Sequence, residues 1–156
     1  MHLVYVYGTL KTGFPNHYLI SDPENGIANF LYEASTVEKF ALVVGSPFHV
    51  PFLLQNTNHG KGNVITGELY EVDDEMLKTL DKLENHPTLY LRSKIQVKRN
   101  TESDVIECDA YLLTNYKLEL LTLPMLTSYN ITTSSSYISP QERSSSETLK
   151  SVKLPN

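Results

Sequence analysis

The chain has 156 residues and a net charge of −5, with 40% hydrophobic and 20% charged residues, as expected for one globular domain with a single core. The acidic balance argues against binding to a nucleic-acid backbone, which requires a basic surface, and favours a small neutral or zwitterionic ligand. No apolar run approaches the roughly 18 residues that span a bilayer, so we expect no association with a membrane.

The first half of the chain is predicted to form short strands separated by loops. Its amino terminus lacks the positive region of a signal peptide. Residues 3–7 are all apolar or aromatic, which indicates a short strand buried on both faces. Asn16 is a suitable cap for a short helix over 17–20. The segment 36–44 alternates weakly and is predicted as a strand, whereas the prolines in 45–54 favour an irregular segment or an edge strand.

The second half contains the clearest helix and the most regular strands. A strand is predicted over 64–72, followed by a helix over 73–84 in which Asp73 is the N-cap. Apolar and polar residues alternate with period two over 90–99 and again over 105–113, which predicts two further strands with one buried face each.

The single cysteine, Cys108, lies on the apolar side of the last predicted strand. We therefore expect it to pack in the core rather than to act as a nucleophile. One cysteine excludes an internal disulfide and fits a reducing compartment, so we expect a cytoplasmic protein. The histidines are scattered without the spacing of a metal site, and no metal or cofactor is predicted.

The composition changes from Thr127 onward, where serine and threonine are frequent and large apolar residues are few. We predict a domain over 1–129 and a Ser/Thr-rich tail over 130–156 that is loosely held, because it has little apolar surface to bury. Five or six short strands and one good helix predict an α+β fold, with the strands curled into a compact barrel.

One carboxylate lies on an unexpected face of the predicted helix. The helix has an apolar arc when each residue turns by about 100°, and this arc contains Met76, Leu77, Leu80 and Leu83. Glu84 follows Leu80 by four residues and projects from the same arc. Its side chain could bend out to water at the helix end, pair with a buried cation or amides, or line a pocket as a proton acceptor. In a pocket, desolvation would raise its pKa, as a general base requires.

The loop after the first strand offers a possible anion site. The stretch "YGTLKTG" (7–13) presents successive backbone N–H groups, and Gly8 is free to take a positive φ. Such a turn can bind a carboxylate, but it can also serve only to turn the chain. Tyr5 and Tyr7 share one face of the strand and are expected in the core. Lys11 could assist an anion or remain solvated. Neither nucleotide-binding glycine motif can be read here.

Three stretches in this order resemble a known family: "YVYGTLKTGFPNH" (5–17), "GELYEVDDEMLKTLDKLENHPTLYLRSKIQV" (67–97) and "LELLTLPMLTSY" (118–129). Together they look like the γ-glutamylcyclotransferase family, and within it the γ-glutamylamine cyclotransferase branch, the AIG2-like proteins. The resemblance implies a small mixed β-barrel with flanking helices and a pocket at the mouth of the barrel.

The resemblance also implies which residues form the site. The family's substrate loop falls on Tyr7, Gly8, Thr9 and Leu10, and its catalytic glutamate falls on Glu84, the residue that the helix pattern marks as misplaced. The branch usually has glycine after this glutamate, where this chain has Asn85; asparagine also tolerates left-handed geometry. The tail departs more strongly from the family pattern.

The activity implied by the resemblance is intramolecular and needs no cofactor. The α-amine of a γ-glutamylamine, such as γ-glutamyl-ε-lysine, attacks its own γ-carbonyl, forms 5-oxoproline and releases a free amine. Glu84 would act as general base and then as general acid. Two alternatives remain open at this point: a cyclotransferase acting on γ-glutamyl amino acids or glutathione, and a small-molecule-binding protein without catalytic activity.

Overall fold

The fold is seen in a computed structural model that describes residues 1–46, 48–55, 61–99, 103–130, 137 and 151–154. Within these residues, seven strands form one sheet in the order β1-β5-β2-β6-β7-β4-β3. The bounds are β1 His2–Val6, β2 Ala28–Thr36, β3 Ala41–Gly45, β4 Val50–Leu54, β5 Thr66–Val72, β6 Tyr90–Arg99 and β7 Val105–Leu113.

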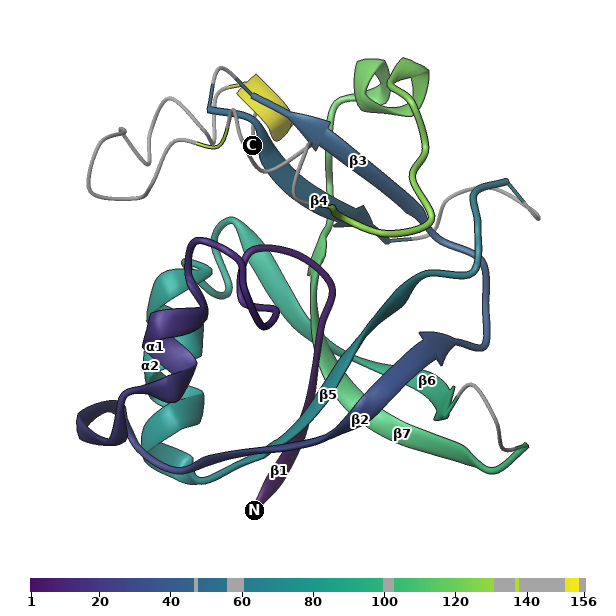
Figure 1. Cartoon of the computed structure of the whole chain (residues 1–156). Helices are drawn as coiled ribbons and strands as arrows, with labels where there is room; N and C mark the ends of the chain where they lie inside the picture. The colour runs from purple at the N-terminus through teal and green to yellow at the C-terminus, as the bar shows by residue number, and fades with distance from the viewer. Residues whose placement is uncertain (47, 56–60, 100–102, 131–136, 138–150, 155–156) are drawn as a thin grey trace.

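Five of these strands close into a barrel, because β1 pairs with β5 on one side and with β7 on the other. The β1–β7 pairing is parallel, whereas β1–β5, β5–β2, β2–β6 and β6–β7 are antiparallel, so the barrel is mixed. Strands β3 and β4 form a hairpin that joins the barrel only through β7, and the hairpin stands apart from the barrel in Figure 1.

Two α-helices flank the barrel on the same side, α1 (His17–Ser21) and α2 (Asp74–Leu83) (Figure 1). Two short 3-10 helices, η1 (Pro23–Asn25) and η2 (Leu118–Thr122), occupy connections. The predicted α+β architecture, a small mixed β-barrel with flanking helices, is confirmed.

The first strand is buried on both faces, as its composition predicts. Val4 and Val6 belong to a core cluster that also contains Met76 and Leu80 of α2. Tyr5 points to the other side and belongs to a second cluster with residues from the remaining barrel strands and the hairpin. Strand β1 therefore separates the barrel interior from the layer under the helix, and the loop that follows it begins at the junction of the two cores.

The strand predicted over 36–44 is confirmed only for residues 41–44, which lie in β3, whereas 37–40 belong to no strand. The chain instead forms β2, which ends at Thr36, and a separate β3 that begins at Ala41. In β2 the register shifts between Phe30 and Tyr32, where a bulge interrupts the pairing with β5. A bulge removes the period-two pattern by which a strand is recognised in sequence.

The segment predicted as irregular or as an edge strand contains β4. Pro51 lies within this strand and is tolerated there because β4 meets β7 at a single bridge, Leu54 to Leu113. The short helix near 17–20 is present as α1, but Asn16 does not cap it through its side chain. That side chain bonds elsewhere, as described below.

The remaining predicted elements match closely: β5, α2, β6 and β7 begin and end within two residues of the predicted bounds. Most of the segment 130–156 lies outside the described residues, so its loose packing stays a prediction. Where it is described, Val152 is fully buried and Tyr137 packs against the core cluster beside the helix.

Cys108 packs inside the barrel with 1% of its surface exposed, as predicted. Burial raises the pKa of its thiol to about 12, so at pH 8 the group is neutral and inert. We expect iodoacetamide at pH 8 to leave the folded protein unmodified and to label it fully once urea unfolds it, as measured by mass spectrometry. Rapid labelling of the folded protein would place the thiol at the surface.

Candidate active site

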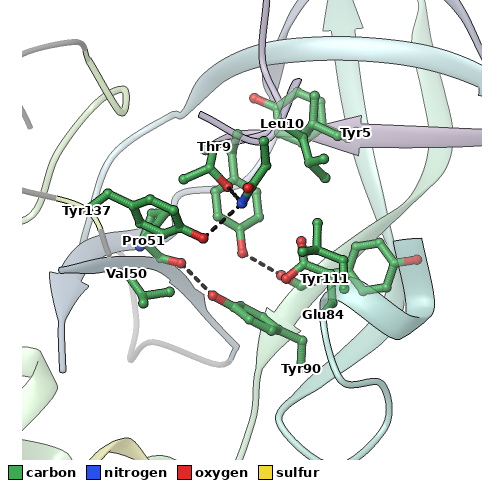
Figure 2. A pocket seen from close by; sticks show the side chains of 14 residues that line it. Tyr5, Thr9, Leu10, Val50, Pro51, Glu84, Tyr90, Tyr111 and Tyr137 are labelled. Carbon is green, nitrogen blue, oxygen red and sulfur yellow. Dashed lines mark hydrogen bonds between the residues drawn. The ribbon is translucent and has the colours of Figure 1, made fainter. Parts of the chain in front are cut away.

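An open pocket lies where the loop after β1 meets the end of α2. Its cavity volume is about 30 Å³, and the open space at its mouth brings the total to about 480 Å³. Strand β4 and the beginnings or ends of the neighbouring barrel strands complete its walls (Figure 2). The lining residues are Tyr5, Val6, Tyr7, Gly8, Thr9, Leu10, Asn16, Val50, Pro51, Leu83, Glu84, Tyr90, Tyr111 and Tyr137.

Helix α2 is fixed at both ends, which determines where its last residues lie. At the start, the Asp73 carboxylate accepts hydrogen bonds from the N–H groups of Met76 and Ile27, at 2.9 and 3.0 Å. Along the helix, Met76 and Leu80 are completely buried, and each contributes about 1.5–3 kcal/mol of hydrophobic stabilisation. The apolar arc therefore faces the core, as the pattern predicts.

The carboxyl end of α2 is a tight cap that begins at Glu84. The N–H of Asn85 donates to the Lys82 carbonyl at 3.2 Å, and the N–H of His86 donates to the Asp81 carbonyl at 2.9 Å. This pair of bonds is the Schellman pattern, which requires a left-handed residue after the cap. Asn85 is that residue, with a φ of 51°. The replacement of the family's glycine by asparagine therefore preserves the helix end.

Substitution of Asn85 tests this backbone requirement. Asn85→Ala is expected to lower the free energy of unfolding by about 1 kcal/mol relative to Asn85→Gly, because left-handed geometry costs a residue with a β-carbon that much. The measurement is the midpoint of urea unfolding at unchanged slope. Equal stability of the two variants would show that the left-handed cap carries no cost.

Asp81 ties the last turn of α2 to the barrel wall. Its carboxylate accepts hydrogen bonds from Nη1 of Arg92 on β6 at 2.5 Å and from the Tyr111 hydroxyl on β7 at 2.6 Å. The Arg92 and Asp81 side chains are both about one quarter exposed, at 27%. The Asp81 carboxylate is therefore hydrogen-bonded to side chains of two neighbouring strands. These bonds fix the position of Glu84, three residues later, relative to the barrel.

Glu84 lines the pocket and is half-buried there. The side chain therefore lies in the wall of a pocket and not in bulk water, while its role as a proton acceptor stays a prediction. Its negative charge acts on the phenols beside it. Burial raises the pKa of Tyr7 and of Tyr111, and the Glu84 carboxylate raises both further. Both phenols are thus neutral hydrogen-bond donors at neutral pH.

Buried phenols hold the pocket walls to one another. The Tyr7 hydroxyl donates to the Tyr111 carbonyl at 2.7 Å, and the Tyr90 hydroxyl donates to the Pro51 carbonyl at 2.7 Å. These bonds join the loop to β7 and β6 to β4 (Figure 2). The floor of the pocket is therefore rigid and largely aromatic. Tyr5 and Tyr7 are buried, as predicted, and they also line the pocket.

Gly8 is required for a reason that differs from the expected one. It is not one of the described glycines with a positive φ, which are Gly13, Gly26 and Gly62. Instead it lies against Pro51 of β4, and a β-carbon placed on Gly8 would come within 2.8 Å of the proline Cγ. Only glycine lets the loop approach the hairpin this closely.

The loop is anchored on both sides of its first turn. The Lys11 N–H donates to the Gly8 carbonyl at 3.1 Å, and the Asn16 N–H donates to the Thr9 carbonyl at 2.8 Å. The N–H groups of Gly8, Thr9 and Leu10 have no hydrogen-bond acceptor among the described residues. The hydrogen bonds that stabilise the loop are therefore accepted by its carbonyl groups, and these three N–H donors are available to a ligand.

Lys11 does not line the pocket. Its ammonium donates to the Tyr129 carbonyl at 2.6 Å and lies over the Phe14 ring. Burial lowers the pKa of this lysine, while the charges of Glu68 and Glu33 act in the opposite direction. Lys11 therefore fastens the loop to the chain near residue 129, and the suggestion that it assists a bound anion has no support in the geometry.

All five residues implied by the family pattern meet in this pocket: Tyr7, Gly8, Thr9, Leu10 and Glu84. Their chemical roles stay predictions. The sequence does not indicate the other nine lining residues as site residues: Tyr5, Val6, Asn16, Val50, Pro51, Leu83, Tyr90, Tyr111 and Tyr137. For these residues a local pattern indicates a cap, burial or disorder but not proximity to a distant segment.

Residues 4–130 match the family described as Gamma-glutamyl cyclotransferase, AIG2-like. The chain belongs to this family. A protein of Drosophila melanogaster described as a putative gamma-glutamylcyclotransferase is 45% identical over 129 residues, which cover 83% of this chain and 80% of the relative. The mouse protein named gamma-glutamylaminecyclotransferase is 40% identical over 133 residues, which cover 81% of this chain and 88% of the relative.

The structural comparison agrees with the sequence comparison. The crystal structure of a mouse AIG2-like protein superposes on this γ-glutamyl cyclotransferase family member with a TM-score of 0.78 and 41% identity, over 83% of this chain and 88% of that one. In the described part of the chain, no helix is long and apolar enough to cross a bilayer. The same residues contain no group of three or more histidine, cysteine or acidic side chains placed to hold a metal ion.

Proposed function

We propose that the protein is a γ-glutamylamine cyclotransferase that releases 5-oxoproline and a free amine from substrates such as γ-glutamyl-ε-lysine. The observation that carries this proposal is that Glu84 and the loop 7–10 line the same pocket. The preference for amines rests on relatives of mouse and human origin that are named gamma-glutamylaminecyclotransferase, at 40% and 34% identity.

The reaction needs two protons to be moved from the α-nitrogen to the departing nitrogen, because the α-ammonium carries three hydrogens and the ring nitrogen of 5-oxoproline carries one. The α-ammonium loses the first proton before its nitrogen attacks the γ-carbonyl carbon and forms a new C–N bond, and the same nitrogen loses the second proton in the tetrahedral intermediate. The intermediate then breaks its C–N bond to the departing nitrogen, which takes up both protons and leaves as an ammonium. Glu84 is the half-buried carboxylate of the pocket, and it can accept the first proton and deliver it to the leaving nitrogen.

The reaction also needs the flexible glutamyl chain to be held in a curled conformation. The N–H groups of Gly8, Thr9 and Leu10, which have no acceptor within the described part of the chain, are suited to an anionic ligand. If they bind the α-carboxylate, the amine and the γ-carbonyl are held in contact, and such positioning supplies several kcal/mol of the barrier reduction. An N–H from the same loop can stabilise the oxyanion of the intermediate.

The test is to incubate purified protein with γ-glutamyl-ε-lysine, γ-glutamyl-alanine and glutathione in parallel, and to measure release of 5-oxoproline. We expect the highest kcat/KM with γ-glutamyl-ε-lysine and equal amounts of 5-oxoproline and lysine. Faster turnover of γ-glutamyl-alanine or glutathione would assign the protein to the other substrate class. No turnover of any of the three would contradict the proposed activity.

A further inference from the structure

Tyr137 is the one described residue of the segment 131–150, and it lines the pocket. Its hydroxyl accepts a hydrogen bond from Nδ2 of Asn16 at 2.8 Å. The same amide nitrogen donates to Oγ1 of Thr9 in the loop at 2.9 Å. Asn16 is only 2% exposed, so this amide is a buried bridge between the carboxyl-terminal segment and the loop (Figure 2).

The Tyr137 ring is held from a second direction. The ring packs against the core cluster that contains Met76 and Leu80 of α2. With its hydroxyl bonded and its ring packed, Tyr137 presents a fixed surface to the pocket.

The depth of the pocket shows which part of a substrate meets this surface. Most lining residues are buried, and four are half-buried at the rim: Thr9, Leu83, Glu84 and Tyr137. If a γ-glutamyl group binds to the loop amides with its nitrogen near Glu84, it occupies the buried part, and its amine portion extends across the rim. Figure 2 shows Tyr137 and Glu84 on opposite sides of the pocket.

We propose that Tyr137 is a specificity-determining residue whose ring contacts the alkyl chain of the departing amine. This inference rests on the cyclotransferase function proposed above. An aromatic ring fixed at the rim favours amines with several methylene groups, and it adds a cation–π attraction when the chain carries a charged group within reach of the ring. Short amines extend too little to reach it.

The test compares kcat/KM for the γ-glutamyl amides of n-butylamine and methylamine, together with the affinity for 5-oxoproline. The butyl-to-methyl ratio is the kcat/KM of the n-butylamide divided by that of the methylamide. Tyr137→Ala is expected to lower this ratio about tenfold, because only the longer alkyl chain loses an apolar contact when the ring is removed. Tyr137→Phe keeps the ring and should keep the ratio. The Kd of 5-oxoproline, which has no amine portion, should stay within about twofold.

Two further variants keep the outcome interpretable. Tyr137→Gln removes the ring but retains a polar end for Asn16, and it should lower the ratio like Tyr137→Ala even if the alanine variant folds poorly. Tyr18→Ala removes an exposed tyrosine of α1 that does not line the pocket, and it should leave the ratio unchanged.

An unchanged ratio in both Tyr137→Ala and Tyr137→Gln, with the unmodified protein active, would overturn the assignment of Tyr137 alone. So would a loss of 5-oxoproline affinity equal to the change in ratio, since Tyr137 would then only support the loop. If the unmodified protein releases no 5-oxoproline from either amide, the proposed function itself fails and the role of Tyr137 fails with it.

Discussion

The Glu84→Gln variant is expected to release 5-oxoproline with a kcat about 10²–10⁴ times lower than that of the original protein. This factor is the usual contribution of a positioned general acid and base. The amide keeps the size and shape of the side chain but cannot accept the proton of the α-ammonium. The backbone bonds of the helix cap do not depend on the side chain, so the variant should fold and melt like the original protein. The measurement is kcat with γ-glutamyl-ε-lysine at saturating concentration.

A matched substitution on the same helix controls for loss of one negative charge. Glu75 lies in the first turn of α2, where its side chain is exposed and forms a surface pair with Lys78 at 3.3 Å. Glu75→Gln should retain full activity, because exposed pairs contribute little. Binding of 5-oxoproline should survive in Glu84→Gln. Activity within tenfold of the original protein would remove Glu84 from the proton transfer.

Gly8→Ala is expected to reduce kcat/KM about 100-fold, through displacement of the loop. The added methyl group would lie 2.8 Å from Pro51 Cγ and 3.4 Å from Pro51 Cβ. The shorter distance is well inside the about 3.5 Å of optimal contact between carbon atoms. The loop and the β3–β4 hairpin must therefore separate, and the N–H groups that would hold the substrate move with the loop.

The cause can be isolated by removing the other partner of this contact. Pro51→Ala deletes the obstructing ring atoms but keeps the carbonyl that accepts from Tyr90. The double variant Gly8→Ala, Pro51→Ala should recover a large part of the lost activity, a coupling that the four-protein cycle measures directly. If the two substitutions have simply additive effects, the contact between loop and hairpin does not position the site.

The site residues that the sequence predicts are those governed by local patterns. The period of α2 is regular enough that Glu84 stands out from the apolar arc, and the stretch from Tyr7 to Leu10 follows a recognisable strand. In both cases the residues that reveal the pattern lie within a single short segment of the chain. The resemblance to the family then identified the same residues, and the structure places them in one pocket.

Other features depend on contacts between distant segments, which a single sequence does not display. The importance of Gly8 comes from Pro51, which lies on a hairpin attached to β7 and far from Gly8 in sequence. Strand β2 escaped detection because its bulge breaks the alternating pattern. Tyr137 lies in a stretch whose composition favours disorder, yet Asn16 holds its hydroxyl.

The most direct measurement is a crystal structure of the protein with 5-oxoproline bound. We expect the product carboxylate to accept hydrogen bonds from N–H groups of Gly8 to Leu10, and the ring nitrogen to lie within about 3 Å of a Glu84 oxygen, as proton transfer requires. A product molecule bound elsewhere, for example in the separate hollow lined by Lys94 and Gln96, or one whose nitrogen points away from Glu84, would contradict the proposed chemistry.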